Sequence, residues 1–368
     1  MSSAQSEATM ADVAHRAGVS VSTVSRTLRG LPTVSDTTRA RVEAAARELS
    51  FAITRSASSL VTGRTGRVAV LMPNLATWFL SSTLSGMAPA LREAGLDLLV
   101  YSVTDVHERA DFFDRLPARR NADALLVVSF SLSPAERARL DDLGMPLVFV
   151  SQHSPGRPSV YVDDEDAALR GTRHLINLGH RRIACLQTHD TTGFAWSSKN
   201  RLTGHLRALA EAGLEHDDSL VMSVPDWKGG GMAPAAGRLL SLPDPPTAMF
   251  TETDDMAFRL LAALREANVP VPGRISVMGF DDHVMAGVMG LTTLAQPAVE
   301  LGRAAVRLTR AVIDDSDGAH ERHIVLPTEL VPRGSTGPPP VGSQAERQPL
   351  GGDTSSAAGT GAGFGTKT

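Results

Sequence analysis

The sequence has very little of what marks a secreted or membrane-bound protein. Its single cysteine, Cys185, excludes an internal disulfide, and the apolar stretch around it predicts a buried and unreactive thiol. No segment reaches the roughly 18 consecutive apolar residues of a membrane helix. The first nine residues hold no apolar run of the kind found in a signal peptide. We therefore expect a cytoplasmic protein that does not enter a membrane.

Motifs of catalysis and cofactor binding are lacking as well. There is no G-x-G-x-x-G after an expected strand, no P-loop and no G-x-S-x-G, and the eleven histidines show no HExxH spacing. His180 is better interpreted as a cap at a helix end than as a metal ligand. An α/β enzyme would need a nucleophile, metal or cofactor constellation, and the sequence presents none. We predict no enzyme activity, no cofactor and no metal.

Aromatic residues make up only 4% of the 368 residues, so the core must be aliphatic. The length predicts two or three domains. A net charge of −4 argues against a chain that coats nucleic acid along its whole length. Residues 9–67, however, hold nine arginines and four acids, a charge of +5 (9 − 4), which leaves −9 (−4 − 5) for the remainder. A basic head on an acidic body is typical of a DNA-binding module.

Residues 9–30 predict two short helices around a tight turn. Thr9 is placed to cap the first helix, and Gly18 to end it, since glycine adopts a positive φ without strain. The apolar residues of this first helix recur at helical spacing: Met10, Val13, Ala14 and Ala17. Ser20 is expected to cap a second helix over residues 21–28.

The second helix has a distinct outer face. Val24 and Leu28 point inward, whereas Ser22 and Arg26 point outward. A helix with small polar residues and an arginine on its outer face suits a DNA major groove, although spacing alone also fits any helical hairpin with a glycine turn. Ser35 is expected to cap a third helix that completes a small core with four apolar residues at helical spacing: Val42, Ala45, Ala46 and Leu49.

The segment Ala11–Arg26, A-D-V-A-x-x-A-G-V-S-x-x-T-V-S-R, resembles the amino-terminal signature of the LacI/GalR family of bacterial transcription regulators. The resemblance implies a hinge helix over residues 55–63. In it Ala57 would allow close approach to the minor groove, and Leu60 would wedge between base steps. The chain departs from the family pattern at Ile53-Thr54 and at Ser58. The alternative for this segment is a plain linker.

After residue 66 the pattern becomes an alternation of short apolar strands and amphipathic helices, typical of parallel sheets covered by helices. The expected fold class is therefore α/β. A three-helix helix-turn-helix domain (9–54) and the hinge helix precede two Rossmann-like lobes (66–332), which the resemblance makes of the periplasmic-binding-protein type. We expect the lobes to divide near residue 163 and the chain to recross near 291–297. Residues 1–8 and 333–368 are expected to be disordered.

The resemblance also implies an effector site in a cleft between the lobes, at the carboxyl ends of strands. Arg201 falls at the family's ligand-clamping arginine, and Asp281 at its hydroxyl-binding aspartate. Trp227 and Phe79 fall at its aromatic walls. Thr253 stands where sugar-binding members commonly have asparagine, so the effector is an atypical sugar, a nucleoside-like molecule or another small polar metabolite.

Together these features predict a DNA-binding transcription regulator, most simply a repressor, controlled by a small polar effector such as a sugar. It would bind a near-palindromic double-stranded operator as a homodimer. Some members of the family form tetramers through an apolar carboxy-terminal heptad helix, and this sequence has no such helix. The alternative is a solute-binding protein of a transport system. The residues predicted to contact DNA are Thr9, Ser20, Val21, Ser22, Thr23, Ser25, Arg26, Ser35, Ala57 and Leu60.

Overall fold

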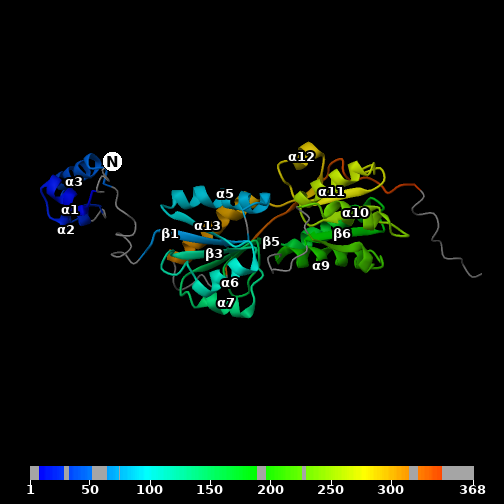
Figure 1. Cartoon of the computed structure of the whole chain (residues 1–368), viewed down its shortest axis with the longest axis horizontal. Helices are drawn as coiled ribbons and strands as arrows, with labels where there is room; N and C mark the ends of the chain where they lie inside the picture. Colours follow the sequence, from blue (N-terminus) through cyan, green and yellow to red (C-terminus); the bar gives the residue numbers. More distant parts are fainter. Residues whose placement is uncertain are drawn as a thin grey trace, which may run out of the picture. The chain divides into compact units, whose positions relative to one another are not determined.

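The computed structural model describes residues 8–28, 33–51, 64–73, 75–188, 196–225, 229–314 and 322–341. The chain forms two compact units (Figure 1). Unit 1 holds Met1–Val162, Thr191–Ser197 and Pro297–Leu326, and unit 2 holds Asp163–Asp190, Ser198–Gln296 and Pro327–Thr368. The units divide at Asp163, next to the position expected from sequence, and the crossing at Pro297 ends the expected 291–297 segment. A further crossing after Leu326 was not foreseen.

Three short helices form the amino-terminal part of the chain: α1 (Met10–Ala17), α2 (Val21–Leu28) and α3 (Asp36–Glu48). Local chemistry fixes their ends. The hydroxyl of Thr9 accepts from the amide of Asp12, whose carboxylate bonds back to Thr9, and Gly18 ends α1 at φ 60°. One buried apolar face from each helix closes a common core: Val13, Ala14, Ala17, Val24, Val42, Ala45 and Ala46.

Unit 1 is built on a six-stranded sheet in the order β11-β5-β4-β3-β1-β2. Its strands are all parallel. Their bounds are β1 (Arg67–Met72), β2 (Asp97–Ser102), β3 (Ala124–Val128), β4 (Leu147–Val150), β5 (Ser159–Val162) and β11 (His323–Leu326). The central strands are buried on both faces, which is why they read as continuous apolar runs.

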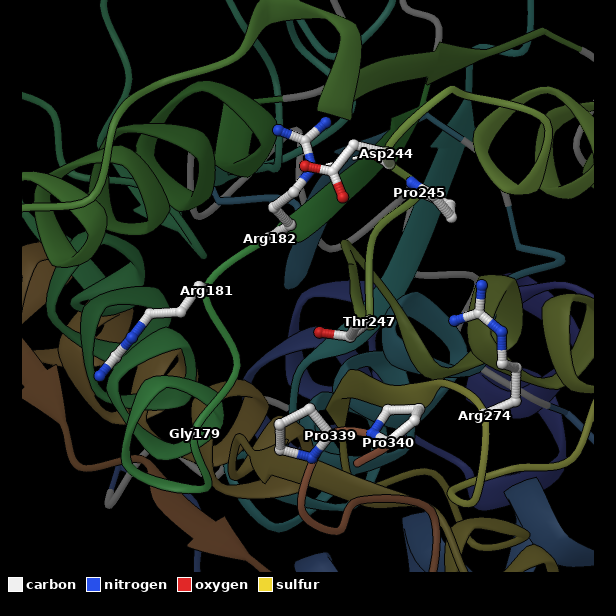
Figure 2. Close-up of a pocket in the computed structure, with 9 residues that line it drawn as sticks. All are labelled: Gly179, Arg181, Arg182, Asp244, Pro245, Thr247, Arg274, Pro339 and Pro340. Carbon is white, nitrogen blue, oxygen red and sulfur yellow. Dashed lines mark hydrogen bonds and ion pairs between the residues drawn. The ribbon is translucent and has the colours of Figure 1, made fainter. Parts of the chain in front are cut away.

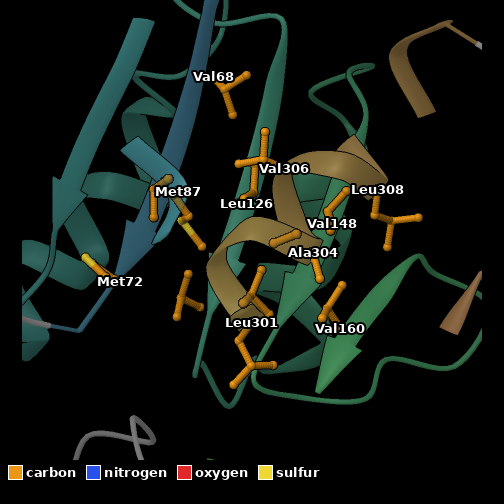
Figure 3. Packing of buried hydrophobic residues seen from close by; sticks show 14 of the residues in the cluster. Val68, Met72, Met87, Leu126, Val148, Val160, Leu301, Ala304, Val306 and Leu308 are labelled. Atoms are coloured by element: carbon orange, nitrogen blue, oxygen red, sulfur yellow. The ribbon is translucent and has the colours of Figure 1, made fainter. Parts of the chain in front are cut away.

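Helices cover both faces of this sheet (Figure 1). They are α5 (Trp78–Glu93) and α13 (Ala298–Asp314) on one face, and α6 (Val106–Arg115) and α7 (Pro134–Asp141) on the other. Leu301, Ala304 and Leu308 of α13 pack onto Val148 and Val160 of the strands (Figure 3). The opposite face is filled by Phe112 and Phe113 of α6, together with Leu140 of α7.

Helices α5 and α13 approach each other closely through a reciprocal pair of glycines. A Cβ added at Gly86 would overlap the carbonyl oxygen of Val299, and one added at Gly302 would overlap that of Thr83. The two helices share one of the most extensive contacts in the unit. The absence of side chains at these two positions therefore sets the distance between the helices.

Unit 2 repeats the architecture with a sheet in the order β12-β10-β9-β8-β6-β7, parallel except for β12 against β10. The strands are β6 (Ile183–Thr188), β7 (Val221–Val224), β8 (Ala248–Thr251), β9 (Ser276–Asp281), β10 (Thr292–Ala295) and β12 (Glu329–Val331). A short 3₁₀ helix, Asp218–Leu220, precedes β7.

The helices of unit 2 are α8 (Asp164–Asn177), α9 (Trp196–Glu211), α10 (Met232–Leu240), α11 (Asp254–Glu266) and the short α12 (Ala286–Met289). Met232, Met256 and Leu260 of α10 and α11 pack on one face of the sheet. Leu175 of α8 and Leu209 of α9 pack on the other. In the described parts of the chain, none of the helices combines the length and the apolar character that a bilayer crossing requires.

The predicted fold class is confirmed: a helical head is followed by two α/β units. Several elements were not assigned from sequence, namely β5, β10, β11, β12, α6, α12 and α13. The strands among them have three or four residues, too few to show a periodic pattern. Helix α13 did carry a signal, because Leu301, Ala305 and Leu308 recur at helical spacing.

The start of the expected carboxy-terminal disorder, residue 333, is wrong. Residues 333–341 lie along unit 2 and are held by specific hydrogen bonds. Arg333 pairs with Asp282 at 2.6 Å, and the hydroxyl of Ser335 donates to the carbonyl of Val277 at 2.6 Å. The buried His180 ring contacts the carbonyl of Gly337 at 2.9 Å. Composition suggested disorder here, but these side chains and backbone groups find partners far away in sequence.

The close approach of α5 and α13 gives a stability prediction. Gly302→Ala should destabilise the protein by about 1–3 kcal/mol, because the added methyl group forces two packed helices apart. Gly237→Ala in α10 is the matched control, since a Cβ there meets nothing within 4 Å. It should leave stability unchanged or raise it by up to about 1 kcal/mol. Urea denaturation of both variants tests this, and an equally stable Gly302→Ala protein would contradict it.

Candidate functional site

Helix α2 presents a polar face to solvent. Val21, Ser22 and Arg26 are exposed and Val24 is buried, as predicted. Leu28, which was also predicted to point inward, is half-buried, and the burial of Thr27 was not predicted. The hydroxyl of Ser20 lies 2.8 Å from that of Ser22 and 2.9 Å from that of Thr23. These groups form a cluster of hydroxyls at the amino-terminal end of α2, where free backbone amides and the helix dipole favour negatively charged groups.

Each of the three amino-terminal helices starts at a hydroxyl cap, and at α2 the hydroxyl of Ser20 accepts from the amide of Thr23 at 3.2 Å, as predicted. Thr9 caps α1, and Ser35 accepts from the amide of Thr38 at the start of α3. Ser25 is half-buried on α2. Arg41 of α3 donates to the carbonyl of Ala17 at 2.6 Å and so fixes α3 against the end of α1. Packing against α1 and α3 therefore holds α2 in place with its polar face exposed. Ala57 and Leu60 of the predicted hinge helix, and Trp227, lie outside the described residues.

In unit 2, a cluster of buried charged side chains lies at the carboxyl ends of the strands. Arg201 of α9 is 4% exposed and pairs with Asp164, the first residue of α8, at 2.8 Å. A second nitrogen of Arg201 donates to the carbonyl of Glu252 at 2.5 Å. Its guanidinium stacks 3.5 Å from the ring centroid of Phe280. Arg201 thus joins α8, α9, β8 and β9, which is a structural role that its position in the sequence did not reveal.

Asp281 ends β9 in the same cluster. Its φ of 135° is a conformation that non-glycine residues rarely adopt, and its neighbour Asp282 has φ 56°. Strain of this kind is commonly found at functional sites. Asp281 is 3% exposed as a residue, and its carboxylate accepts a hydrogen bond of 2.6 Å from Nε2 of Gln296. Burial raises the pKa of Asp281 well above its usual range in spite of the nearby Arg201.

The start of α11 supplies two further polar residues, Thr253 at its cap and Asp254 at its first position. Thr253 caps α11 through its hydroxyl, which accepts from the amide of Met256. Asp254 accepts from the hydroxyl of Thr293 at 2.6 Å and from the amide of His283 at 2.8 Å. A Cβ at Gly279 would overlap this carboxylate. Asp254 therefore connects the start of α11 to β10 and to the segment after β9. Its burial raises its pKa to about 6.

Of the predicted effector residues, Arg201 and Asp281 come together, and their charges interact. Thr253 lies next to Glu252, whose carbonyl Arg201 binds. Phe79 belongs to unit 1, where it lies in the first turn of α5 and packs partly on the core. The carboxyl ends of the unit 1 strands also carry strained residues, Ser129 and Ser151, with φ 53° and 58°.

Sequence reasoning missed three members of the cluster: Asp164, Glu252 and Gln296. Glu252 is 6% exposed, and its carboxylate accepts from the amide of Thr188 at 2.6 Å and from the hydroxyl of Ser198 at 2.5 Å. A signal was present for Glu252, which directly follows the assigned strand β8, whereas β5 and β10, which precede Asp164 and Gln296, are too short to be recognised from sequence. Residues in that position share one edge of a parallel sheet.

A separate cavity of about 320 Å³ lies at the opposite edge of the unit 2 sheet, beside the amino ends of β6, β8 and β9 (Figure 2). Arg182, Thr247 and Arg274 line it, and Pro339 and Pro340 of the carboxy-terminal segment form another wall. Arg182 is committed to Asp217 and Asp244. This cavity is remote from the Arg201 cluster along the strands, so it is not the predicted effector site.

Comparisons with known proteins match two stretches of the chain to family descriptions. Residues 9–52 match the description "Bacterial regulatory proteins, lacI family", and residues 172–336 match a periplasmic binding protein-like domain. The chain is 31% identical over 339 residues to the HTH-type transcriptional regulator DegA of Bacillus subtilis (strain 168). That alignment covers 90% of this chain and 98% of DegA.

Two solved structures are similar over nearly the whole chain. The lac repressor dimer bound to operator and the anti-inducer ONPF has a TM-score of 0.79 at 26% identity, covering 90% of this chain and 100% of that one. The transcriptional regulator CelR in complex with cellobiose has a TM-score of 0.65 at 29% identity, covering 89% and 99%. A helix-turn-helix match over residues 9–52 favours a regulator over a solute-binding protein of a transport system.

The buried ion pair gives a prediction about stability. Arg201→Ala should cost about 3–5 kcal/mol, because it leaves the Asp164 carboxylate buried without its partner. Burial already raises the pKa of Asp164, and losing the guanidinium raises that pKa further. The folded mutant then binds more protons than the unfolded chain. Its loss of unfolding free energy relative to the wild type should therefore grow as the pH rises and shrink in acid.

Arg207→Ala is the control, because Arg207 lies on the same helix but its ion pairs with Glu165 and Glu211 are exposed. It should change stability little at any pH. Urea denaturation of both variants across a pH series is the measurement. The account would be contradicted if Arg201→Ala lost no more unfolding free energy than Arg207→Ala, or if its loss did not depend on pH. The Arg201–Asp164 pair would then not be essential to the fold.

Proposed function

The chain belongs to the lacI family of bacterial regulatory proteins and is a DNA-binding transcriptional regulator, and we propose that it is a repressor governed by a small polar effector. The observation that carries this proposal is the exposed face of α2, where Ser22 and Arg26 project from a helix fixed by its neighbours. In helix-turn-helix proteins the second helix enters the major groove.

The contacts with DNA divide into two classes. Ser22 and Arg26, with Val21 beside them, face the base edges, since arginine recognises guanine with two hydrogen bonds. The hydroxyl groups around the helix starts bind phosphates and fix the register without reading sequence. They are Thr9, Ser20, Thr23, Ser25 and Ser35. Ala57 and Leu60 complete the proposed interface in the minor groove.

The effector binds at the carboxyl edge of the unit 2 sheet. Asp281 and Arg201 supply an acceptor and a donor of hydrogen bonds for hydroxyl groups, and Thr253 lies beside them. Phe79 and Trp227 remain the aromatic residues that the sequence predicts for the face of a ring. A sugar or a related polar metabolite fits this set, and the similar CelR structure contains cellobiose. Binding there shifts the affinity for operator, with a coupling of about 1–3 kcal/mol.

The regulator acts as a homodimer on a near-palindromic operator. Unit 2 exposes an apolar patch around α12 formed by Val284, Met285, Val288 and Met289, two of which are more than 70% exposed. A contiguous patch of this kind commonly marks a protein interface. The similar lac repressor structure is a dimer on operator DNA. A two-fold dimer presents two copies of α2 to two half-sites.

Arg26→Ala should weaken binding to the operator on the order of tenfold and leave non-specific binding and the fold intact, because it removes a base contact. Arg92→Ala, an exposed arginine in α5, loses the same charge outside the head and should bind like the wild type. Fluorescence anisotropy at fixed salt, with operator and scrambled DNA, makes the comparison. Equal losses on both DNAs would assign Arg26 to phosphate binding instead.

Val288→Asp should convert the dimer to a monomer, because it places a charge at the centre of the α12 patch. Val325→Asp is the matched control, since Val325 is 53% exposed in unit 1. Sedimentation velocity of the two variants and the wild type tests the assignment. A dimeric Val288→Asp protein would place the interface elsewhere.

A further inference from the structure

The Arg201 cluster holds more negative charge than its one cation can balance. Arg201 faces three buried carboxylates, those of Asp164, Glu252 and Asp281, and pairs directly only with the first. Asp164 and Asp254 each begin a helix, so the dipoles of α8 and α11 offset part of their charge. Glu252 and Asp281 stand at strand ends and have no such compensation.

Among the described residues, the donors available to these two strand-end carboxylates are neutral. Glu252 accepts from the amide of Thr188 and the hydroxyl of Ser198. Asp281 accepts from the amide group of Gln296. The other charged groups that act on the cluster are mostly acidic as well, namely Asp163, Asp255 and Asp282, and Arg333 is paired with Asp282. The site therefore carries a surplus of about two negative charges when its carboxylates are ionised.

A second observation is independent of charge. Oε1 of Gln296 is buried and receives no hydrogen bond from any residue that the structure describes. Gln296 is 5% exposed, and its other amide atom is bonded to Asp281. A buried acceptor without a donor is costly, so such atoms are usually satisfied by a ligand or water. This acceptor belongs to the same amide group whose Nε2 donates to Asp281 at 2.6 Å, so it lies close to the Asp281 carboxylate.

We propose that the effector carries a protonated amino group, which donates to the Asp281 carboxylate and to Oε1 of Gln296. The site then takes an amino-bearing polyol such as an amino sugar, and rejects phosphorylated and carboxylated relatives. The proposal rests on the proposed function, because it names the ligand class of that same effector site. A cation with N–H groups balances part of the surplus negative charge and also donates a hydrogen bond to the unmatched acceptor.

The pH dependence follows from the raised pKa values of the cluster. Burial raises the pKa of Asp281 well above its usual range and that of Asp254 to about 6. As the pH rises, the carboxyl groups lose their protons, and the attraction for an amine grows. A neutral sugar would bind with little dependence on pH, and an anionic ligand would bind better in acid.

The test compares matched probes on the full chain. They are glucose, galactose and mannose, their 2-amino forms and their 6-phosphates, each measured by calorimetry near pH 5.5 and near pH 7.5. At least one amino sugar should bind roughly tenfold more tightly than its parent near pH 7.5, with a smaller ratio near pH 5.5. The 6-phosphates should bind more weakly than the parents. The same compound should alter operator affinity.

Variants identify the groups responsible. Asp281→Asn and Glu252→Gln should each reduce the preference for the amino form over the parent by severalfold while leaving operator binding in place, which also shows that they fold. Glu266→Gln, an exposed carboxylate at the end of α11, removes the same charge and should keep the preference.

Two kinds of failure are separable. Preference for a neutral or phosphorylated sugar, an amine preference that survives both variants, or no binding by any amino form overturns the amine proposal while operator binding stands. If the wild-type chain itself did not bind operator DNA more tightly than scrambled DNA, the proposed function would be overturned instead.

Discussion

The buried ion pair between Arg201 and Asp164 organises the chemistry of unit 2. Two charges removed from water are tolerable only when they compensate each other. The pair draws in the carbonyl of Glu252 and the ring of Phe280, so that four elements meet at one guanidinium. The strained backbone of Asp281 persists in this setting because the surrounding contacts over-determine it. The same arrangement concentrates carboxylates at the sheet edge where a ligand is expected.

The amino-terminal head was largely predictable from sequence, because its signals are local. The cap at Thr9, the positive φ at Gly18 and the cap at Ser35 each depend on residues within four positions of one another. The apolar spacing of α1 and α2 then decides which face is buried and which carries Arg26. Alternation of strands and helices likewise predicted two α/β units from patterns of five to fifteen residues.

The site was predictable only in part. Arg201 and Asp281 stand in short segments that resemble a known family, whereas Glu252 and Gln296 acquire their roles from partners more than ten residues away. The structural role of Arg201 follows from Asp164, 37 residues earlier in the chain. The carboxy-terminal segment was missed for the same reason. Its composition resembles a disordered tail, but Ser335 and Gly337 bond to residues about sixty positions away.

The helical head and the charged cluster belong to one regulator only if ligand and DNA binding are coupled. Coupling is reciprocal, so an effector that lowers operator affinity must itself bind more weakly to the operator complex, by the same factor. The most direct measurement is the affinity of the full chain for the DNA upstream of its own gene, at fixed salt, with and without an amino sugar, together with the affinity for that sugar with and without the DNA. Two equal ratios different from one are the predicted result, and a ratio of one in both measurements would contradict the account.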